Sequence, residues 1–176
     1  MNESGEPSSS TVIDLYARML AGWNRRDADA FAAVFAHTSL CVGFDGSQMH
    51  GRDEIARELR AIFAHHQTAS YVARVRSVRQ LDVHVALLHA VVGMVPPGQH
   101  ELNPAANAVQ CVVVAMVAGE PKIVLLQNTP AAFHGRPELV ERMTAELTEV
   151  LRTGREGVGD RDAQAEDHRD RGGSAG

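Results

Sequence analysis

The sequence predicts a small α+β domain that spans residues 11–152. Three segments with helical periodicity open the chain, long segments rich in β-branched residues follow, and one more helical segment closes it. Apolar residues at helical spacing mark the buried face of a helix, whereas β-branched runs bounded by turn residues are typical of strands. With 176 residues, the chain is long enough for one domain with a sizeable core.

Four amphipathic segments predict the helices. The first has an apolar stripe at Val12, Tyr16, Met19, Leu20 and Trp23. Asp27 is placed to cap a short second helix through residues 31–35, because an aspartate side chain accepts hydrogen bonds from the first free N–H groups of a helix. The third helix opens after Gly51 with two carboxylates in its first turn, where they favour the helix dipole. The fourth covers residues 137–152.

The remaining apolar segments predict strands. They are residues 40–44, 47–50, 71–78, 83–95, 106–118 and 122–129. Several of these strands are apolar on both faces, so both faces of the sheet must be covered. The first three helices can cover one face. The last helix or a second subunit must cover the other, and we expect a homodimer that packs sheet to sheet.

Composition restricts the classes of function. The chain has 17 basic and 22 acidic residues and no basic block, which argues against a nucleic-acid partner. No apolar stretch is long enough to span a membrane, and the start of the chain lacks the pattern of a signal peptide, so a cytoplasmic location is expected. Residues 1–10 and 153–176 are polar and are expected to be disordered tails.

The chain also lacks the usual signs of a cofactor or a metal. Cys41 and Cys111 lie far apart inside apolar runs and are expected to be free buried thiols. They have no neighbouring ligand partner, and no histidine pair has metal-binding helical spacing, so no metal site is expected. No phosphate-binding glycine loop follows a strand, so no nucleotide cofactor is expected.

Four short strings carry a resemblance to a known family. They are Trp23-Asn24 followed by Asp27-Ala28-Asp29, then Phe31 to Phe35, Gly51-Arg52-Asp53-Glu54-Ile55, and Gln127-Asn128-Thr129. Together with the order of elements, these strings resemble the nuclear transport factor 2-like (SnoaL-like) superfamily over residues 11–130. Trp23-Asn24 and Asn128-Thr129 look most like the SgcJ/EcaC-type group, whose members occur in the biosynthesis of polyketide and enediyne antibiotics.

The resemblance implies a cone-shaped fold. In that fold a curved, mixed or antiparallel sheet surrounds an apolar pocket, and the three N-terminal helices close it. Members of the superfamily include steroid isomerases, polyketide cyclases, dehydratases and many proteins without catalysis. The fold alone therefore does not decide the function.

The steroid-isomerase mechanism is not expected here. It needs a carboxylate base, a phenol and a protonated acid. Alignment of the strings places these three groups at Val42, Met19 and Val113, none of which can exchange a proton. The predicted strands contain no Asp or Glu, and Asp45 and Asp82 lie in turns, where they are expected to accept hydrogen bonds from the local backbone.

The resemblance and the two-residue period of the strands give a candidate pocket. Its expected lining is Tyr16, Met19, Trp23, Phe35, Val42, Phe44, Met49, Asn107, Val113, Leu126, Asn128 and His134. The large apolar side chains suit a polyene, steroid-like or aromatic ligand. Asn107 and Asn128 can orient a carbonyl or hydroxyl group of the ligand, or they can hold a strand end in place.

Three hypotheses of function remain open. The first is a protein of secondary metabolism that binds a hydrophobic small molecule without cofactor chemistry. The second is an enzyme of the cyclase, isomerase or dehydratase kind, with His84 or His89 as the acid–base group and Asn128 as a donor. These two histidines interrupt the longest predicted strand and are expected to face opposite sides of the sheet. The third is a dimerisation module whose pocket is filled by side chains.

Overall fold

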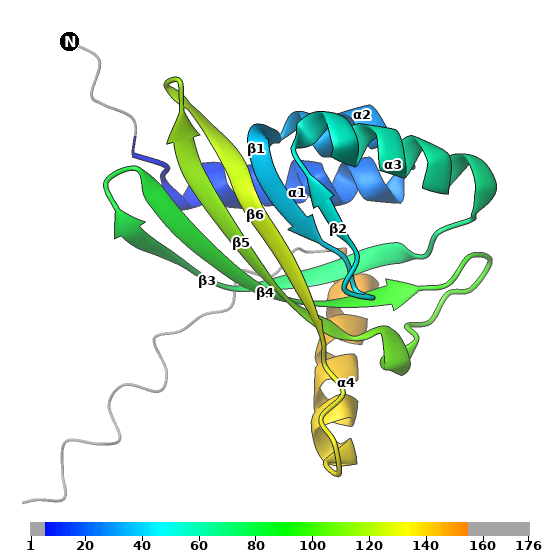
Figure 1. Ribbon diagram of the computed structural model, residues 1–176. Coiled ribbons are helices and arrows are strands. Elements are labelled where there is room, and N and C mark those ends of the chain that lie inside the picture. Colours follow the sequence, from blue (N-terminus) through cyan, green and yellow to red (C-terminus); the bar gives the residue numbers. More distant parts are fainter. Residues whose placement is uncertain (1–5, 155–176) are drawn as a thin grey trace, which may run out of the picture.

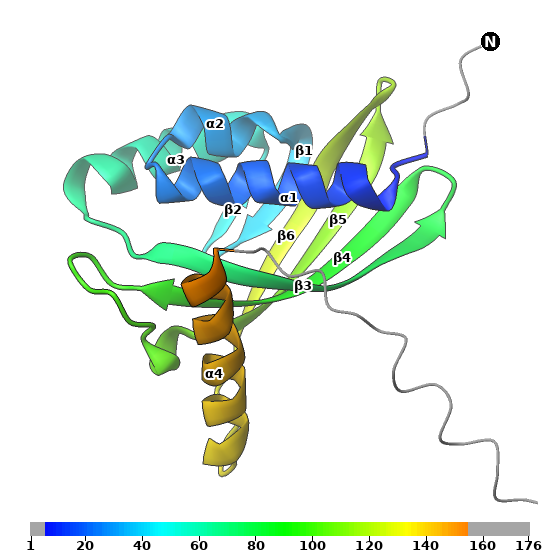
Figure 2. The same cartoon turned by 180° about the vertical axis from the view of Figure 1, so that it is seen from behind.

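The computed structural model describes residues 6–154. These residues form a curved six-stranded sheet with three helices on one face and a fourth helix on the other (Figures 1 and 2). We call the face toward the first three helices the inner face and the opposite face the outer face. The predicted α+β class is confirmed. Most of the two expected tails, residues 1–5 and 155–176, lies outside the described residues.

The N-terminal helices begin at side-chain caps. Helix α1 (Ser9–Asn24) starts before the expected residue 11 because Ser8 accepts a hydrogen bond from the N–H of Thr11 at 3.2 Å. Asp27 caps α2 (Ala28–Ala33), as its position in the sequence indicated, and accepts from the N–H of Ala30 at 2.9 Å. Since α2 ends at Ala33, Phe35 belongs to the first strand and not to the predicted helix.

The other two helices end or begin at backbone features. Helix α3 (Arg52–His65) follows Gly51, whose φ of 80° suits glycine, and a Cβ there would lie 2.5 Å from the carbonyl oxygen of His37. Helix α4 (Pro137–Thr153) begins with a proline and ends at Gly154 in the left-handed conformation. None of the helices in residues 6–154 has both the length and the apolar composition needed to cross a membrane.

The sheet is mixed. Its strands are β1 (Phe35–Val42), β2 (Gln48–His50), β3 (Ser70–Asp82), β4 (Val85–Val95), β5 (Ala108–Val117) and β6 (Glu120–Pro130). Their order across the sheet is β2-β1-β6-β5-β4-β3. Strands β1 and β6 run parallel, and the other neighbours are antiparallel. A short 3-10 helix, η1 (Pro104–Ala106), lies in the loop between β4 and β5.

The main core lies between the inner face and α1 to α3. Its strand residues alternate with outward ones, as Ala86, Leu88, Ala90 and Val92 do on β4, and all four are fully buried. Helix α4 packs on the outer face of β3 and β4 over a second apolar cluster that includes Val91, Met143 and Leu147. Glu146 on α4 also pairs with Arg74 and Arg76 on β3. Helix α4 leaves the outer face of β5, β6 and β1 largely without a covering helix (Figure 1).

Candidate ligand-binding cavity

A cavity of about 250 Å³ lies between the inner face of the sheet and helices α1 to α3. It opens beside the turn that joins β1 to β2. Six of the predicted pocket residues line it, namely Met19, Trp23, Phe44, Met49, Leu126 and Asn128. Its volume lies just below the range of about 300–1,000 Å³ that is usual for small-molecule sites, so the space suits a compact ligand.

Aromatic rings build one wall of the cavity. The ring of Trp23 contacts those of Phe63 and Tyr71, each at a centroid distance of 5.4 Å. The indole N–H of Trp23 donates to the carbonyl oxygen of Ala69 at 2.9 Å, which fixes the ring beside the start of β3. Asn24 makes two hydrogen bonds to the backbone of Tyr71, at 2.8 and 3.0 Å. The Trp23-Asn24 string therefore holds the edge strand β3 against α1.

A chain of buried polar side chains forms the floor. Tyr16 Oη donates to Gln110 Oε1 at 2.6 Å, and Gln110 Nε2 donates to Asn128 Oδ1 at 2.7 Å. Asn128 Nδ2 in turn donates to the carbonyl oxygen of Val42 at 2.9 Å. Gln110 and Asn128 are 1% and 8% exposed, and both line the cavity. Asn128 therefore has the structural role of tying β6 to the end of β1, and it also faces the space where a ligand would lie.

The rim is the turn between β1 and β2. Asp45 Oδ1 accepts hydrogen bonds from the hydroxyl and the backbone N–H of Ser47, at 2.7 and 3.0 Å. These hydrogen bonds hold the pKa of the exposed Asp45 carboxyl below its usual value of 3.8. Asp45 thus bonds to the local turn, as the sequence indicated, but it also lies in the lining at the mouth of the cavity.

Two further ionisable groups in the lining stay neutral at ordinary pH. Burial raises the pKa of the Cys41 thiol to about 12. Burial raises the pKa of the Tyr71 phenol to about 12 as well, with a smaller contribution from Cys41. A protonated thiol is a weak nucleophile, and neither group can exchange a proton readily at neutral pH. Near neutral pH, the lining therefore contains no group that is prepared to act as an acid or a base.

Three predicted lining residues lie on the wrong face. Val42 and Val113 point to the outer face, because their neighbours Cys41 and Val112 are the ones that are buried on the inner side. Asn107 is buried under α4 on the outer side, where its amide donates to the hydroxyl of Thr144 at 2.8 Å. A shift of one residue in a strand moves every side chain to the other face, and both faces here are apolar, so the two-residue period alone did not identify the inner face.

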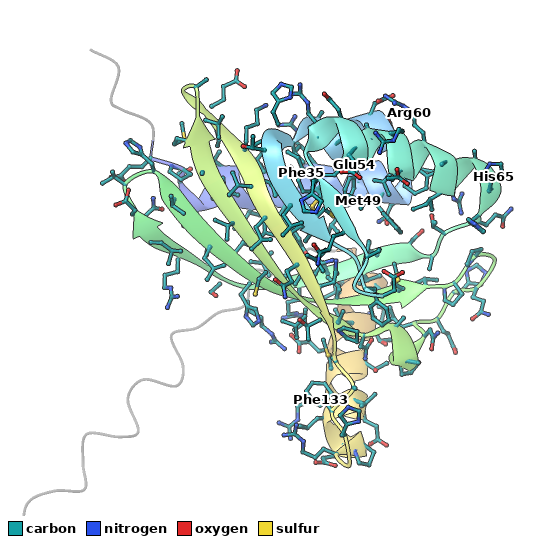
Figure 3. The ribbon with its side chains drawn as sticks, viewed as in Figure 1. Phe35, Met49, Glu54, Arg60, His65 and Phe133 are labelled. Atoms are coloured by element: carbon teal, nitrogen blue, oxygen red, sulfur yellow. The ribbon has the colours of Figure 1, made fainter. Side chains whose placement is uncertain are left out.

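Two other predicted lining residues are buried beside the cavity without lining it. Tyr16 reaches it only through its hydrogen bond to Gln110. Phe35 is fully buried at the start of β1, where its ring stacks on that of Phe31 at a centroid distance of 5.3 Å. Met49, which Figure 3 labels on the neighbouring strand β2, pairs with Cys41 further along β1 and belongs to the lining.

The candidate histidines lie away from the cavity. His84 is exposed in the turn between β3 and β4, not inside a strand. His89 alternates with the buried Leu88 and Ala90 and so faces the outer side of β4. His134 follows Phe133 in the segment that leads into α4. Figure 3 shows Phe133 beside α4, and this residue packs on the second apolar cluster. No histidine is in the lining of the cavity, so the predicted acid–base role of His84 or His89 has no support there.

Sequence reasoning missed several lining residues, of which Cys41, Tyr71 and Gln110 are the most informative. Gln110 carried a usable signal, since it is the one amide in the otherwise apolar residues 108–117. Cys41 was missed by the same one-residue shift that misplaced Val42. Among residues 6–154, no three His, Cys, Asp or Glu side chains gather in a way that could hold a metal ion.

A curved mixed sheet that wraps around three N-terminal helices, with a cavity between them, defines the nuclear transport factor 2-like class of α+β domains. The model of one family within this class, the SnoaL-like domain, matches residues 16–126, which is more than half of the chain. The chain therefore belongs to the SnoaL-like domain family. Helix α4 lies beyond the matched residues. No curated protein sequence matches the chain.

Solved structures show the same fold at low sequence identity. A domain of unknown function with a cystatin-like fold from Nostoc punctiforme has a TM-score of 0.70 and 24% identity, over 85% of this chain and 99% of that one. A ketosteroid isomerase-like protein from Erwinia carotovora atroseptica has a TM-score of 0.54 and 15% identity, over 70% of this chain and 95% of that one. An NTF-2 like protein from Shewanella oneidensis has a TM-score of 0.53 and 14% identity, over 67% of this chain and 95% of that one.

Proposed function

We propose that this protein binds a small, uncharged, mainly apolar molecule in the cavity and releases it unchanged. The observation that carries the proposal is a mainly apolar cavity whose polar floor consists of amides. Gln110 and Asn128 can hold a ligand oxygen, but amides neither give up nor take up protons near neutral pH. The walls supply the aromatic and aliphatic surface that an apolar ligand requires.

The ionisable groups of the lining support binding over catalysis. The thiol of Cys41 and the phenol of Tyr71 stay protonated, and the carboxylate of Asp45 stays ionised, over the whole neutral range. A general base works best when its pKa lies near the working pH, and the low pKa of Asp45 makes it a weak base. A cyclase, isomerase or dehydratase reaction would therefore need an acid–base group that this lining lacks.

A role in the biosynthesis of a secondary metabolite is the proposed setting. It is supported by the likeness of Trp23-Asn24 and Asn128-Thr129 to the SgcJ/EcaC-type group of polyketide and enediyne pathways. The size and the apolar walls of the cavity agree with a compact polyketide-like intermediate. On this proposal the protein holds a hydrophobic intermediate away from water until an enzyme of the pathway uses it.

Ligand binding can be followed through Trp23, since it is the single tryptophan of the chain and lines the cavity. Titration with an uncharged two-ring aromatic ketone should change its fluorescence and raise the melting temperature. Leu126→Phe, which fills the cavity, should weaken binding about tenfold, from an overpacking penalty of about 1–3 kcal/mol. Leu81→Phe is the matched control, because Leu81 is 51% exposed near the end of β3 and lies outside the lining.

Two results would contradict this proposal. The first is equal loss of affinity in Leu126→Phe and Leu81→Phe, which would place the ligand outside the cavity. The second is conversion of a bound ketone to a product that mass spectrometry detects, at a rate that rises with protein concentration. The second result would favour the cyclase, isomerase or dehydratase alternative.

We also propose that two copies pack through their outer faces as a homodimer. Leu40, Leu125, Val113 and Leu87 are paired in register across β1, β6, β5 and β4 and form one apolar row. The row is only partly buried, because α4 packs on β3 and β4 and not on β1 and β6. An apolar row of this kind at the centre of an open sheet face is typical of an interface.

Sedimentation equilibrium at micromolar protein concentrations tests the homodimer. Val113→Asp should yield a monomer with an unchanged far-UV spectrum, because two carboxylates would meet in an apolar interface. Val83→Asp is the matched control, since Val83 is 53% exposed in the turn between β3 and β4 and lies away from the row. A wild-type monomer, or a Val113→Asp dimer as stable as that of the wild type, would refute the proposed interface.

A further inference from the structure

One hydroxyl group in the lining of the cavity has no partner among residues 6–154. It belongs to Tyr71 on the edge strand β3, and the hydrogen bonds of this residue are those of its backbone. Strands β5 and β4 lie between β6 and β3 in the sheet, but the sheet curves, so Tyr71 and Asn128 line the same cavity (Figures 1 and 2). Buried hydroxyl groups are usually paired, so this one is available to a ligand.

The side chain of Tyr71 is held in place from two sides. Asn24 accepts from its backbone N–H at 2.8 Å and donates to its carbonyl oxygen at 3.0 Å. The ring packs on that of Trp23 at a centroid distance of 5.4 Å. A donor that is fixed before the ligand arrives loses little conformational freedom on binding.

The hydroxyl of Tyr71 is a neutral donor. Burial raises the pKa of the phenol to about 12, so the group keeps its hydrogen at neutral pH. Cys41, which lines the cavity from β1, makes a smaller contribution to this rise, and that contribution agrees with a hydroxyl that faces the cavity. The apolar walls therefore contain a donor that carries no charge.

The amides of the floor can add further donors. The carbonyl oxygen of Val42 can only accept, so Asn128 must turn its Nδ2 toward it. Asn128 Oδ1 then accepts from Gln110 Nε2, and Gln110 Oε1 accepts from Tyr16. This order fixes the orientation of both amides. Each amide nitrogen keeps a second hydrogen that has no partner among the described residues.

We propose that Tyr71 determines the ligand class by donating a hydrogen bond to a carbonyl oxygen of the ligand. The cavity then recognises uncharged aromatic carbonyl compounds, such as ketones and lactones, by this oxygen. A second carbonyl group of the ligand can accept from Asn128 or Gln110. The hydroxyl of Tyr71 orients the ligand and keeps its proton. This inference names the ligand class of the proposed binding function and rests on that function.

Two ligands of the same shape test the inference. They are acetylnaphthalene and its isopropenyl analogue, in which a CH2 group replaces the carbonyl oxygen. Isothermal titration calorimetry measures the affinity of both compounds for the wild type and for Tyr71→Phe. In Tyr71→Phe the ketone should bind about two- to tenfold more weakly, the effect of losing one uncharged hydrogen bond, whereas the isopropenyl compound should bind both proteins alike. Differences in the hydration of the two compounds cancel in this comparison.

A control variant and a spectroscopic measurement assign the effect to the hydrogen bond. Ser70→Ala is the matched control, since it removes a hydroxyl from the neighbouring residue of β3, which is exposed and lies outside the lining. It should bind the ketone as the wild type does. A hydrogen bond to a carbonyl oxygen weakens the C=O bond. The infrared stretching frequency of the bound, isotope-labelled ketone should therefore be higher in Tyr71→Phe than in the wild type.

The possible results separate this inference from the proposed function. An unchanged affinity for the ketone in Tyr71→Phe, an equal loss of affinity for both compounds, or an unchanged carbonyl frequency would each overturn the inference and leave the binding function standing. If neither compound binds to the wild type, the proposed function fails and the inference fails with it.

Discussion

Removal of the Tyr16 hydroxyl gives a direct test of the polar floor. Tyr16→Phe deletes one oxygen from a side chain that is 2% exposed and leaves the ring in place, so little packing is lost. The change removes the donor that satisfies Gln110 Oε1 at 2.6 Å. Gln110 is itself 1% exposed, so bulk water cannot easily replace the lost donor.

The expected cost follows from that burial. A buried acceptor that loses its partner costs about 1–3 kcal/mol, which is more than the net contribution of an ordinary hydrogen bond. Gln110→Leu should cost at least as much, because it removes the partner of both Tyr16 and Asn128. The double variant should cost less than the sum of the two single changes, by about 0.5–3 kcal/mol, since all three side chains belong to one network.

Urea unfolding at a single protein concentration measures these free energies. Tyr71→Phe is the matched control, because Tyr71 is the other tyrosine of the chain and its hydroxyl makes no hydrogen bond within residues 6–154. That variant should change the free energy of unfolding by less than about 0.5 kcal/mol. Two results would refute the hydrogen-bonded network of the floor. One is an equal change in the free energy of unfolding in Tyr16→Phe and Tyr71→Phe. The other is a double variant whose change equals the sum of those of Tyr16→Phe and Gln110→Leu.

Two further predictions concern stability. Since the thiol of Cys41 ionises near 9.0 when unfolded and near 12 when folded, the unfolded state binds fewer protons between these values. Stability should therefore fall as the pH rises from 9.0 toward 12, and less steeply in Cys41→Ala, as urea unfolding across this range would show. Gly22→Ala should destabilise the protein by about 1–3 kcal/mol despite the better helix propensity of alanine, measured in the same way. Its Cβ would lie 2.5 Å from the backbone nitrogen of Phe31, and a stable Gly22→Ala variant would contradict the close approach of α1 and α2.

Helical and strand regions differ in how far the sequence predicts the site. A helix that packs on a core shows one apolar stripe, so the inward positions of Met19 and Trp23 follow from spacing alone. The strands are apolar on both faces, because one face covers the cavity and the other carries α4 or the apolar row. Their two-residue period therefore predicts which residues share a face but not which face is inside. Asn107 and Val113 do share a face, and it is the outer one.

The strand ends show a second limit of local patterns. Strand β3 runs from Ser70 to Asp82, longer than the expected residues 71–78, although its last four residues are exposed and three of them are polar. Pairing with β4 extends it, since backbone hydrogen bonds between strands do not depend on which side chains follow. Pairing across this hairpin depends on the backbone, so the composition of residues 79–82 alone does not reveal it.

The direction of the hydrogen bonds in the floor strengthens the distinction between binding and catalysis. Tyr16 donates to Gln110, Gln110 to Asn128, and Asn128 to the backbone of Val42. All three hydrogen bonds are therefore donated in the same direction, from α1 toward β1. The phenol of Tyr16 is thereby separated from the cavity by an amide, and an amide does not pass a proton on near neutral pH. Even a ligand carbonyl that bonds to Asn128 would gain orientation and polarisation but no proton. The amides that would hold a ligand oxygen in the proposed function are therefore groups that do not transfer a proton near neutral pH.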